Sequence, residues 1–354
     1  MVRLSKAAIL EVVGQPLRIR SIQIPDLQRG QVLVKVLYSG VCRSQLMEVA
    51  GSRGPDAWLP HLLGHEGSGI VLEVGPDVSK VKARDEVILG WVKGDGIEAP
   101  GAKYLCDGQV INSGRVTTFS NYTVVSETRL VKKPFGLPMD IATLFGCALP
   151  TGAGMVLNEI NPLPSSIVAV LGLGGIGLSA LMALKAMGVE KIIAIDVSDE
   201  KLDLAKELGV THIINSQNED CVSVLHNIFS QGVDFCIESG GTVSTIELGF
   251  KLVRQHGGQL LFASHPPEGD QIRLSPHELI SGKKIAGSWG GASKPDIDIP
   301  KIFQIFSKAK IPMESLLTKR YRLEDINEAL EDLRLGRVFR PLIVMDHFED
   351  LKTQ

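Results

Sequence analysis

The sequence predicts an α/β protein with two domains, one β-rich and one built on a doubly wound parallel sheet. The 354 residues exceed the soft limit of about 150 residues for one domain. Short β-branched runs dominate the first 150 residues, whereas strand-like and helical segments alternate after Pro164. Parallel strands need long crossover connections, so this alternation predicts a parallel sheet.

Local patterns give the expected elements in chain order. Short β-branched runs bounded by Gly, Pro or Asp predict three early strands, at residues 31–38, 69–74 and 86–89. The glycine-rich stretch 93–115 has almost no periodicity and is predicted as a loop. Later strands are expected at residues 167–171, 191–197, 212–215, 233–238 and 259–264. Helices are expected up to residue 187, from the N-cap Ser198 to the stop at Gly209, and over residues 324–335.

The composition is that of an ordinary globular protein, with 44% hydrophobic and 22% charged residues and a net charge of -3. This balance predicts no nucleic-acid partner and no attraction to an anionic membrane. The uncharged stretch from Ile160 to Leu184 is long enough to span a bilayer. It contains two prolines and four glycines and changes its period halfway, so we expect a strand and a helix there instead of a membrane span.

A glycine-rich motif marks a candidate dinucleotide site. Gly172-Leu-Gly174-Gly175-Ile176-Gly177 follows a predicted strand and opens a predicted helix, the setting in which such glycines let a pyrophosphate approach the backbone. Asp196 ends the next strand, 19 residues after Gly177, where a carboxylate accepts hydrogen bonds from the adenosine ribose. Because a carboxylate repels a 2′-phosphate, NAD is favoured over NADP. Lys201 either reaches the same ribose or is a solvated helix lysine.

Three widely separated residues suit one metal ion. Cys42, His65 and Cys147 each lie within two residues of a glycine. Two thiolates with one imidazole match a catalytic zinc site that keeps a fourth position open. Taken singly, each cysteine is better explained as a small buried apolar residue. Their occurrence together beside a dinucleotide motif favours the metal site.

Several segments together resemble one enzyme family. They are Gly40–Ser44, Gly64–Gly69, Gly146–Gly154, the glycine motif with Asp196, and Gly336–Arg340. Over essentially its full length, the chain resembles a zinc-containing alcohol dehydrogenase of the medium-chain dehydrogenase/reductase superfamily. The resemblance implies a GroES-like catalytic domain at residues 1–149 and 290–354 and a Rossmann cofactor domain at residues 150–289. It also implies a homodimer that transfers a hydride between a primary or secondary alcohol, or the matching aldehyde or ketone, and NAD.

The resemblance also implies a role for each matching residue. Cys42, His65 and Cys147 would bind a catalytic zinc, which acts as a Lewis acid towards the alcohol, and Glu66 would be able to enter its coordination sphere. Ser44 would hydrogen-bond the substrate oxygen and pass on its proton. Arg43 and Arg340 would hold the pyrophosphate, and Thr151 would lie by the nicotinamide. Trp58, Trp91, Trp289 and His265 fall in segments that would border the substrate.

Three departures from the family pattern carry expectations of their own. Where relatives often carry four cysteines for a structural zinc, residues 91–115 contain only Cys106, so we expect one zinc per chain. Gln45 replaces a common aspartate partner of the zinc histidine, which predicts a more electrophilic zinc and a less rigidly oriented His65. Met47 replaces a histidine that often ends the proton relay, so the relay must end elsewhere.

Other interpretations remain open at this stage. Polyol or sugar dehydrogenases on the same fold tend to replace the third ligand by a carboxylate, unlike Cys147. Oxidation of a glutathione adduct would need a basic pocket, which Arg115 alone hardly supplies. A catalytically silent NAD-binding protein should have lost a ligand or Ser44. Five scattered cysteines, and charged residues within the first 13 positions, predict a cytoplasmic location without a signal peptide.

Overall fold

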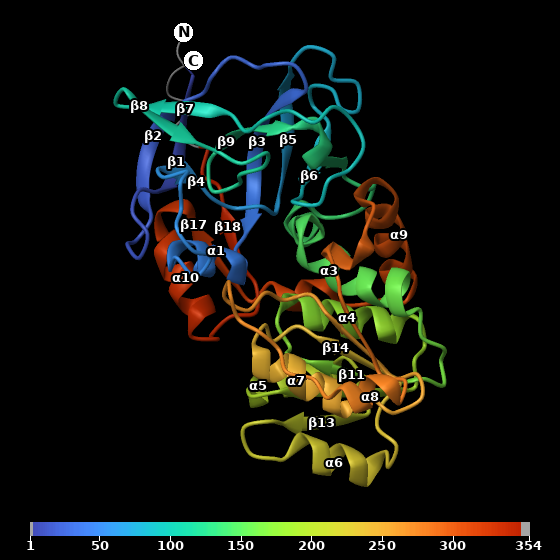
Figure 1. The fold of residues 1–354 in the computed structure, drawn as a ribbon. Helices are drawn as coiled ribbons and strands as arrows, with labels where there is room; N and C mark the ends of the chain where they lie inside the picture. Colours follow the sequence, from blue (N-terminus) through green and yellow to red (C-terminus); the bar gives the residue numbers. More distant parts are fainter. Residues whose placement is uncertain (1–2, 348–354) are drawn as a thin grey trace. The chain divides into compact units, whose positions relative to one another are not determined.

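The computed structural model describes residues 3–347, which form two compact units (Figure 1). Unit 1 contains the chain up to Cys147, the segment Lys294–Phe303, and the chain from Pro312 onward. Unit 2 contains Ala148–Ser293 and Gln304–Ile311. The helix α9 (Pro295–Lys308) therefore belongs to unit 1 in its first part and to unit 2 in its last part.

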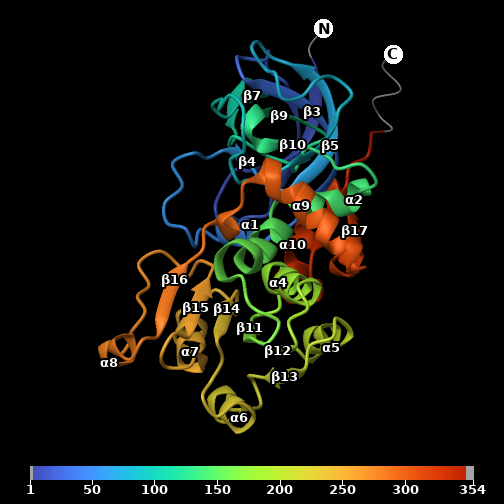
Figure 2. The same cartoon turned by 90° about the vertical axis from the view of Figure 1, so that its right-hand side faces the viewer.

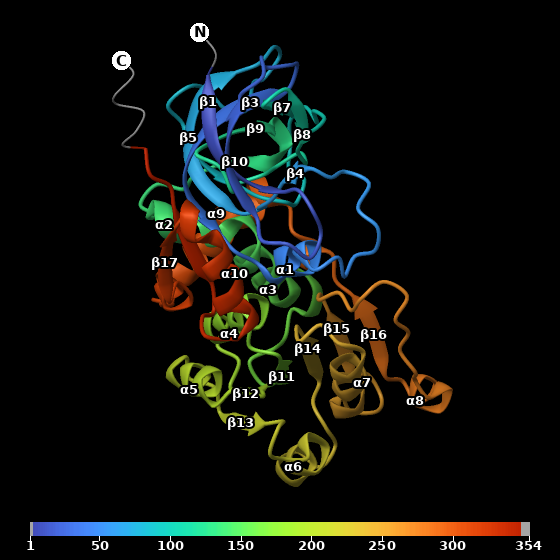
Figure 3. The same cartoon turned by 90° about the vertical axis from the view of Figure 1, so that its left-hand side faces the viewer.

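Unit 1 is built on β-strands, as the sequence predicts. Five strands close a barrel (Figure 3), in the order β1 (Leu4–Leu10), β2 (Arg18–Gln23), β7 (Lys103–Cys106), β8 (Gln109–Asn112) and β4 (His61–Leu62). A second sheet runs β10 (Leu130–Lys132), β6 (Glu86–Leu89), β5 (Gly67–Val74), β3 (Gln31–Gly40), β18 (Pro341–Val344) and β17 (Lys319–Arg322), with β9 (Tyr122–Ser126) paired to β3. These strands bury apolar side chains such as Ile9, Val34 and Val87.

Short helices complete unit 1. They are α1 (Arg43–Val49), α2 (Met139–Ala142) and α10 (Ile326–Arg334), and 3-10 turns such as η2 (Thr143–Gly146) connect them to the strands. The apolar face of α10 packs into a buried cluster through Ile326, Ala329 and Leu330. This helix lies within the stretch for which the sequence predicts one.

Unit 2 carries a six-stranded parallel sheet with the predicted alternation of strands and helices. Figure 2 shows its strands, whose order is β13 (His212–Asn215), β12 (Lys191–Asp196), β11 (Ile167–Leu171), β14 (Phe235–Glu238), β15 (Gln259–Phe262) and β16 (Lys284–Gly287). Its helices are α3 (Ala148–Gly154), α4 (Gly175–Ala186), α5 (Asp199–Glu207), α6 (Cys221–Ile228), α7 (Val243–Leu252) and α8 (Pro276–Ile280). The strand order reverses between β11 and β14, as in doubly wound nucleotide-binding sheets.

Two sequence predictions can be compared directly with local structure. Ser198 caps α5 by accepting from the backbone of Lys201, as predicted. The predicted loop at residues 93–115 is wrong in part, because it contains the β7–β8 hairpin, which turns at Asp107 and Gly108 with positive φ angles. A half-buried strand usually alternates polar and apolar residues, but here the exposed positions carry the apolar residues Leu105 and Val110. The sequence therefore lacks the alternation that would have predicted these strands.

The stretch from Ile160 to Leu184 contains strand β11 and most of helix α4. Among the described residues, no single helix has the length and apolar character needed to cross a membrane. Among the described residues, two consecutive helical segments, Met139–Gly146 and Ala148–Ile160, reach that length and apolar character only when they are counted together, and the chain bends between them.

Candidate metal and cofactor sites

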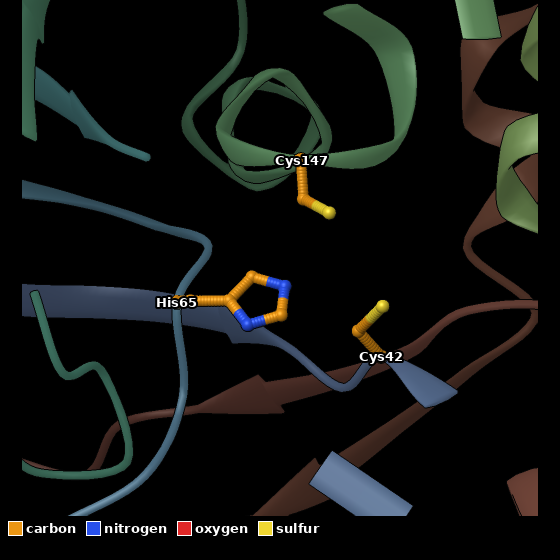
Figure 4. A group of neighbouring side chains, drawn as sticks. All are labelled: Cys42, His65 and Cys147. Atoms are coloured by element: carbon orange, nitrogen blue, oxygen red, sulfur yellow. The ribbon is translucent and has the colours of Figure 1, made fainter. Parts of the chain in front are cut away.

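Cys42, His65 and Cys147 come together in unit 1, although they lie far apart in the sequence. Cys42 follows β3 and caps α1, His65 lies between β4 and β5, and Cys147 follows η2. Their ligand atoms all lie within 4.8 Å of one another, and their side chains point towards a common centre (Figure 4). Nε2 of His65 is buried and has no hydrogen-bond partner within residues 3–347. Two sulfurs and one unsatisfied imidazole nitrogen fit zinc.

The pKa values of the two cysteine thiols shift in opposite directions. A hydrogen bond from Cys147 is the main cause that holds the pKa of the Cys42 thiol well below its usual value, and the charge of Arg340 adds to this against the effect of burial. The same hydrogen bond, with burial, raises the pKa of Cys147. Burial lowers the pKa of His65, but the hydrogen bond and charge of Cys42 together with the charges of Glu66 and Glu48 outweigh it, so that the pKa is raised overall. The hydrogen bond between the two thiols therefore favours ionisation of Cys42 over that of Cys147, and a divalent cation would favour ionisation of both thiols.

Two residues of α1 contact the imidazole of His65. Nε2 of Gln45 lies 2.6 Å from Nδ1 of His65, and Oγ of Ser44 lies 3.4 Å from the same atom. The Gln45 side chain is buried, and its oxygen accepts a hydrogen bond from the backbone N–H of Cys42 at 2.9 Å. Gln45 thus occupies the position from which a partner orients the ring, and a less rigidly oriented His65 in the zinc-bound enzyme stays a prediction.

Glu66 and Arg340 form a buried ion pair beside the three ligands. Nη1 of Arg340 lies 3.1 Å from Oε1 of Glu66 and also donates to the carbonyl of Val41. A Cβ on Gly40 would collide with the Glu66 carboxylate, and one on Gly146 would lie 2.8 Å from its Cα. These two glycines, which lie close to the cysteine ligands in the sequence, thus make room for Glu66. The guanidinium of Arg340 is directed at this carboxylate within unit 1.

The glycine motif of unit 2 has the geometry of an anion site. Gly172 has a φ of 88°, and a Cβ on Gly177 would collide with the carbonyl of Gly172. A Cβ on Gly174 would meet no described atom within 4 Å, and this residue precedes α4 without a side-chain cap. The free space at Gly174 and the N-terminus of a 12-residue helix fit a bound pyrophosphate.

Asp196 lies at the end of β12 beside that motif. Its Oδ2 accepts the backbone N–H of Leu173 at 2.6 Å, and its Oδ1 accepts that of Ser198 at 3.0 Å. Nζ of Lys201 lies 3.9 Å from Oδ1. These bonds fix the Asp196 carboxylate at the ends of β11 and β12, the first two strands of the parallel sheet, where such proteins bind the ribose. Lys201 is close enough to bind the same group.

The remaining predicted residues are found in different settings. Arg43 is exposed in the first turn of α1, whereas Thr151 is buried in α3 of unit 2. Trp58 and Trp289 are exposed, and Trp289 contacts the ring of His265. Trp91, shortly after β6, is half-buried.

Sequence analysis did not identify Glu159, which hydrogen-bonds Ser288 within unit 2. The one available signal is an acidic residue among the mainly apolar residues of Met155–Ile160.

Comparison with known proteins agrees with the fold and the site. Residues 28–135 match the alcohol dehydrogenase GroES-like domain, and residues 175–308 match the zinc-binding dehydrogenase family. The crystal structure of benzyl alcohol dehydrogenase from Acinetobacter calcoaceticus is 30% identical, with a TM-score of 0.89, over 98% of this chain and 100% of that one. An alcohol dehydrogenase class-3 from Cereibacter sphaeroides is 29% identical over 96% of this chain and 99% of its own length. An S-(hydroxymethyl)glutathione dehydrogenase from Paracoccus denitrificans is 28% identical over the same shares.

The fold and the three convergent donors define a zinc-binding dehydrogenase with a GroES-like and a Rossmann-type domain. The chain belongs to the zinc-containing alcohol dehydrogenases of the medium-chain dehydrogenase/reductase superfamily. It is an oxidoreductase that acts on small-molecule alcohols or aldehydes. The predicted family, fold class and enzyme class are therefore confirmed.

Proposed function

We propose that the chain uses one zinc ion per chain, held by Cys42, His65 and Cys147, and NAD as the hydride carrier. The observation that carries this proposal is the convergence of three donor atoms within 4.8 Å around a buried imidazole nitrogen that has no partner among the described residues. When bound, the zinc supplies a Lewis acid that makes an alcohol more acidic, and the nicotinamide exchanges the hydride.

The side chains around the donors have separate tasks. Gln45 contacts Nδ1 of the His65 ring, whose Nε2 would bind the metal once the Gln45 amide has turned to accept the Nδ1 proton. Ser44 hydrogen-bonds the substrate oxygen and passes on its proton. Glu66 is a carboxylate near the metal position, and Arg340 compensates its buried charge. Met47 carries no proton, so the proton leaves Ser44 through water or the cofactor hydroxyls.

The cofactor would be held mainly by unit 2. We assign the Rossmann domain to residues 150–289 and the GroES-like catalytic domain to residues 1–149 and 290–354. In unit 2, the backbone from Gly172 to Gly177 binds the pyrophosphate, Asp196 and Lys201 bind the ribose, and Thr151 packs by the nicotinamide. Arg43 and Arg340 add positive charge for the pyrophosphate.

Other substrates on this fold receive less support. A glutathione adduct carries several carboxylates, but Arg115 already pairs with Glu98 at 2.9 Å. A polyol dehydrogenase would be expected to use a carboxylate as the third ligand, and this chain has Cys147. An alcohol without several charges therefore suits the chain better.

We also propose a cytoplasmic homodimer. All five cysteines are free thiols, which suits a reducing compartment. Strand β16 ends the parallel sheet, and one of its edges pairs with no other described strand. Open edges are the places where a second copy adds strands, so the dimer would form through an edge of this sheet.

The proposed function is tested by following NADH absorbance with a panel of primary and secondary alcohols before and after chelation. We expect NAD-dependent activity that is lost when zinc is removed and that returns when zinc is added. The Cys147→Ser variant should lose both the zinc and the activity. Activity that survives complete removal of zinc would contradict the proposal.

A further inference from the structure

Trp289 and His265 form an exposed aromatic pair at one edge of the parallel sheet in unit 2. His265 follows β15 and Trp289 follows β16, so both extend from the carboxyl ends of neighbouring parallel strands. Their ring centroids lie 6.3 Å apart at an interplanar angle of 71°, and Trp289 is 71% exposed. Ligands of such sheets bind beyond the carboxyl ends of the strands.

The position of the pair within the sheet indicates which part of the ligand it meets. Asp196, the proposed ribose partner, ends β12, on one side of the switch point between β11 and β14. A doubly wound sheet has two mononucleotide halves, so the half formed by β14, β15 and β16 remains for the nicotinamide. The substrate carbon must contact the nicotinamide to exchange a hydride. Residues that follow β15 and β16 therefore border the substrate.

A hydrogen-bond network holds the segment that carries Trp289. The hydroxyl of Ser288 donates to Oε1 of Glu159 and accepts the backbone N–H of Gly291 at 3.1 Å. The side-chain amide of Asn158 donates to the carbonyl of Gly291 at 3.2 Å. Both Asn158 and Glu159 belong to a π-helical turn, Met155–Ile160, a geometry that is rare and frequent at functional sites.

Close backbone packing fixes the other end of the same segment. Gly291 has a φ of 67°, and a Cβ there would lie 2.7 Å from the carbonyl oxygen of Pro150 and 2.8 Å from Cα of Gly154. The hydroxyl of Ser293 donates to the same Pro150 carbonyl at 2.8 Å. The backbone of the segment is therefore held on both sides of Trp289, which fixes the point from which the exposed ring extends.

We propose that the Trp289–His265 pair selects alcohols with a planar aromatic ring, and that Glu159 is a positioning residue that acts through Ser288. An indole has only two side-chain torsions, so on a backbone that is already held it loses little conformational freedom when a ligand covers it. Aromatic rings gain from edge-to-face and offset contacts in a way that saturated rings of equal size do not. The inference rests on the proposed function, because it concerns the substrate of the same reaction.

Comparison of benzyl alcohol, cyclohexylmethanol and ethanol tests the proposal on the zinc-loaded enzyme with NAD. We expect Trp289→Leu to lower kcat/KM for benzyl alcohol about tenfold, with less than about a threefold change for the other two alcohols. Trp289→Phe should retain most of the preference for the aromatic ring. Phe135→Leu, which removes a fully exposed aromatic residue of unit 1, is the matched control and should change nothing.

The positioning role of Glu159 needs its own variants. Glu159→Gln keeps an oxygen acceptor for Ser288 and should retain the ring preference, whereas Glu159→Ala and Ser288→Ala should lose it. Saturation-transfer NMR of benzyl alcohol in the enzyme–NADH complex provides a readout without turnover. Transfer to the ring protons should fall in Trp289→Leu and in Glu159→Ala.

Distinct results would overturn the inference or its basis. Equal losses for benzyl alcohol and cyclohexylmethanol in Trp289→Leu would show general packing and would overturn ring selection. If size-exclusion chromatography shows that Trp289→Leu is a smaller oligomer than the wild type, Trp289 belongs to a subunit interface and the inference that it selects the substrate is overturned. If the wild type oxidises none of the alcohols, the proposed function itself fails and the inference fails with it.

Discussion

The amide nitrogen of Gln45 lies 2.6 Å from Nδ1 of His65, and the amide oxygen of the same side chain accepts the backbone N–H of Cys42. In this arrangement the amide donates to Nδ1, so the ring proton belongs on Nε2. A histidine that binds metal through Nε2 needs its proton on Nδ1, where it requires an acceptor. Zinc binding must therefore turn the Gln45 amide at the expense of its bond to Cys42.

The substitution Gln45→Glu should remove this conflict. In this variant, one carboxylate oxygen accepts the Cys42 N–H and the other accepts Nδ1–H of His65. We expect the affinity for zinc to rise about 10- to 100-fold, because such partners of metal-binding histidines have effects of this size. Competition with a chromophoric chelator measures the affinity without any turnover.

Two further substitutions separate the charge from the geometry at this position. Gln45→Asp restores the carboxylate on a shorter side chain and should also tighten zinc binding, whereas Gln45→Leu removes both hydrogen bonds and should weaken it. The pH profile of alcohol oxidation should shift in the two acidic variants. If zinc affinity and pH profile are unchanged in both of them, the amide does not limit metal binding.

The number of zinc ions follows from the position of the remaining cysteines. Cys106 lies on β7 as the one thiol in residues 91–115 and cannot form a four-ligand cage alone. We expect about one zinc per chain by metal analysis, none in Cys42→Ser, and an unchanged content in the matched variant Cys106→Ser. A second tightly held zinc in the wild type would contradict the prediction.

The choice of cofactor should depend on Asp196. In Asp196→Asn, one oxygen remains to accept a backbone N–H, but the negative charge that repels a 2′-phosphate is lost. Like charges placed together cost several kcal/mol, so the ratio of kcat/KM for NAD to that for NADP should fall about 10- to 100-fold. Asp199→Asn, at the start of α5, serves as the control because it removes a nearby charge. An unchanged ratio in Asp196→Asn would mean that another residue sets the preference.

The parts of the site that sequence could reveal are those encoded locally. The glycine motif and Asp196 lie within one strand–helix–strand unit, so their spacing alone predicts the arrangement that the structure shows. The zinc ligands have no such spacing, so their residue types, the neighbouring dinucleotide motif and the family resemblance had to connect them. The bond between Glu159 and Ser288 joins positions 129 residues apart. No periodic pattern relates these two residues, so only the folded chain reveals their contact.

A buried carboxylate, Glu127, joins two loops of unit 1, one at Ser79 and Lys80 and the other at Ile97. Its oxygens accept three backbone N–H groups, those of Ser79 at 2.8 Å, Lys80 at 2.6 Å and Ile97 at 2.7 Å. Burial raises the pKa of Glu127, but these bonds outweigh burial and lower that pKa below its ordinary value of 4.5. A group with a depressed folded pKa stabilises the protein above its unfolded pKa and loses this contribution as the pH falls through the folded pKa.

Glu127→Gln should therefore destabilise the protein at pH 7 by about 2 kcal/mol, the typical worth of a hydrogen bond to a charged group. Its amide has only one acceptor oxygen for three donors. Urea denaturation should show a constant difference from wild type down to about pH 5, and the difference should narrow below about pH 4.5. Glu98→Gln is the control: Glu98 pairs with Lys93 and Arg129 at the surface, so its smaller effect should fade in high salt. A penalty for Glu127→Gln that is the same at about pH 7 and about pH 4 would assign the effect to packing and not to the carboxylate charge.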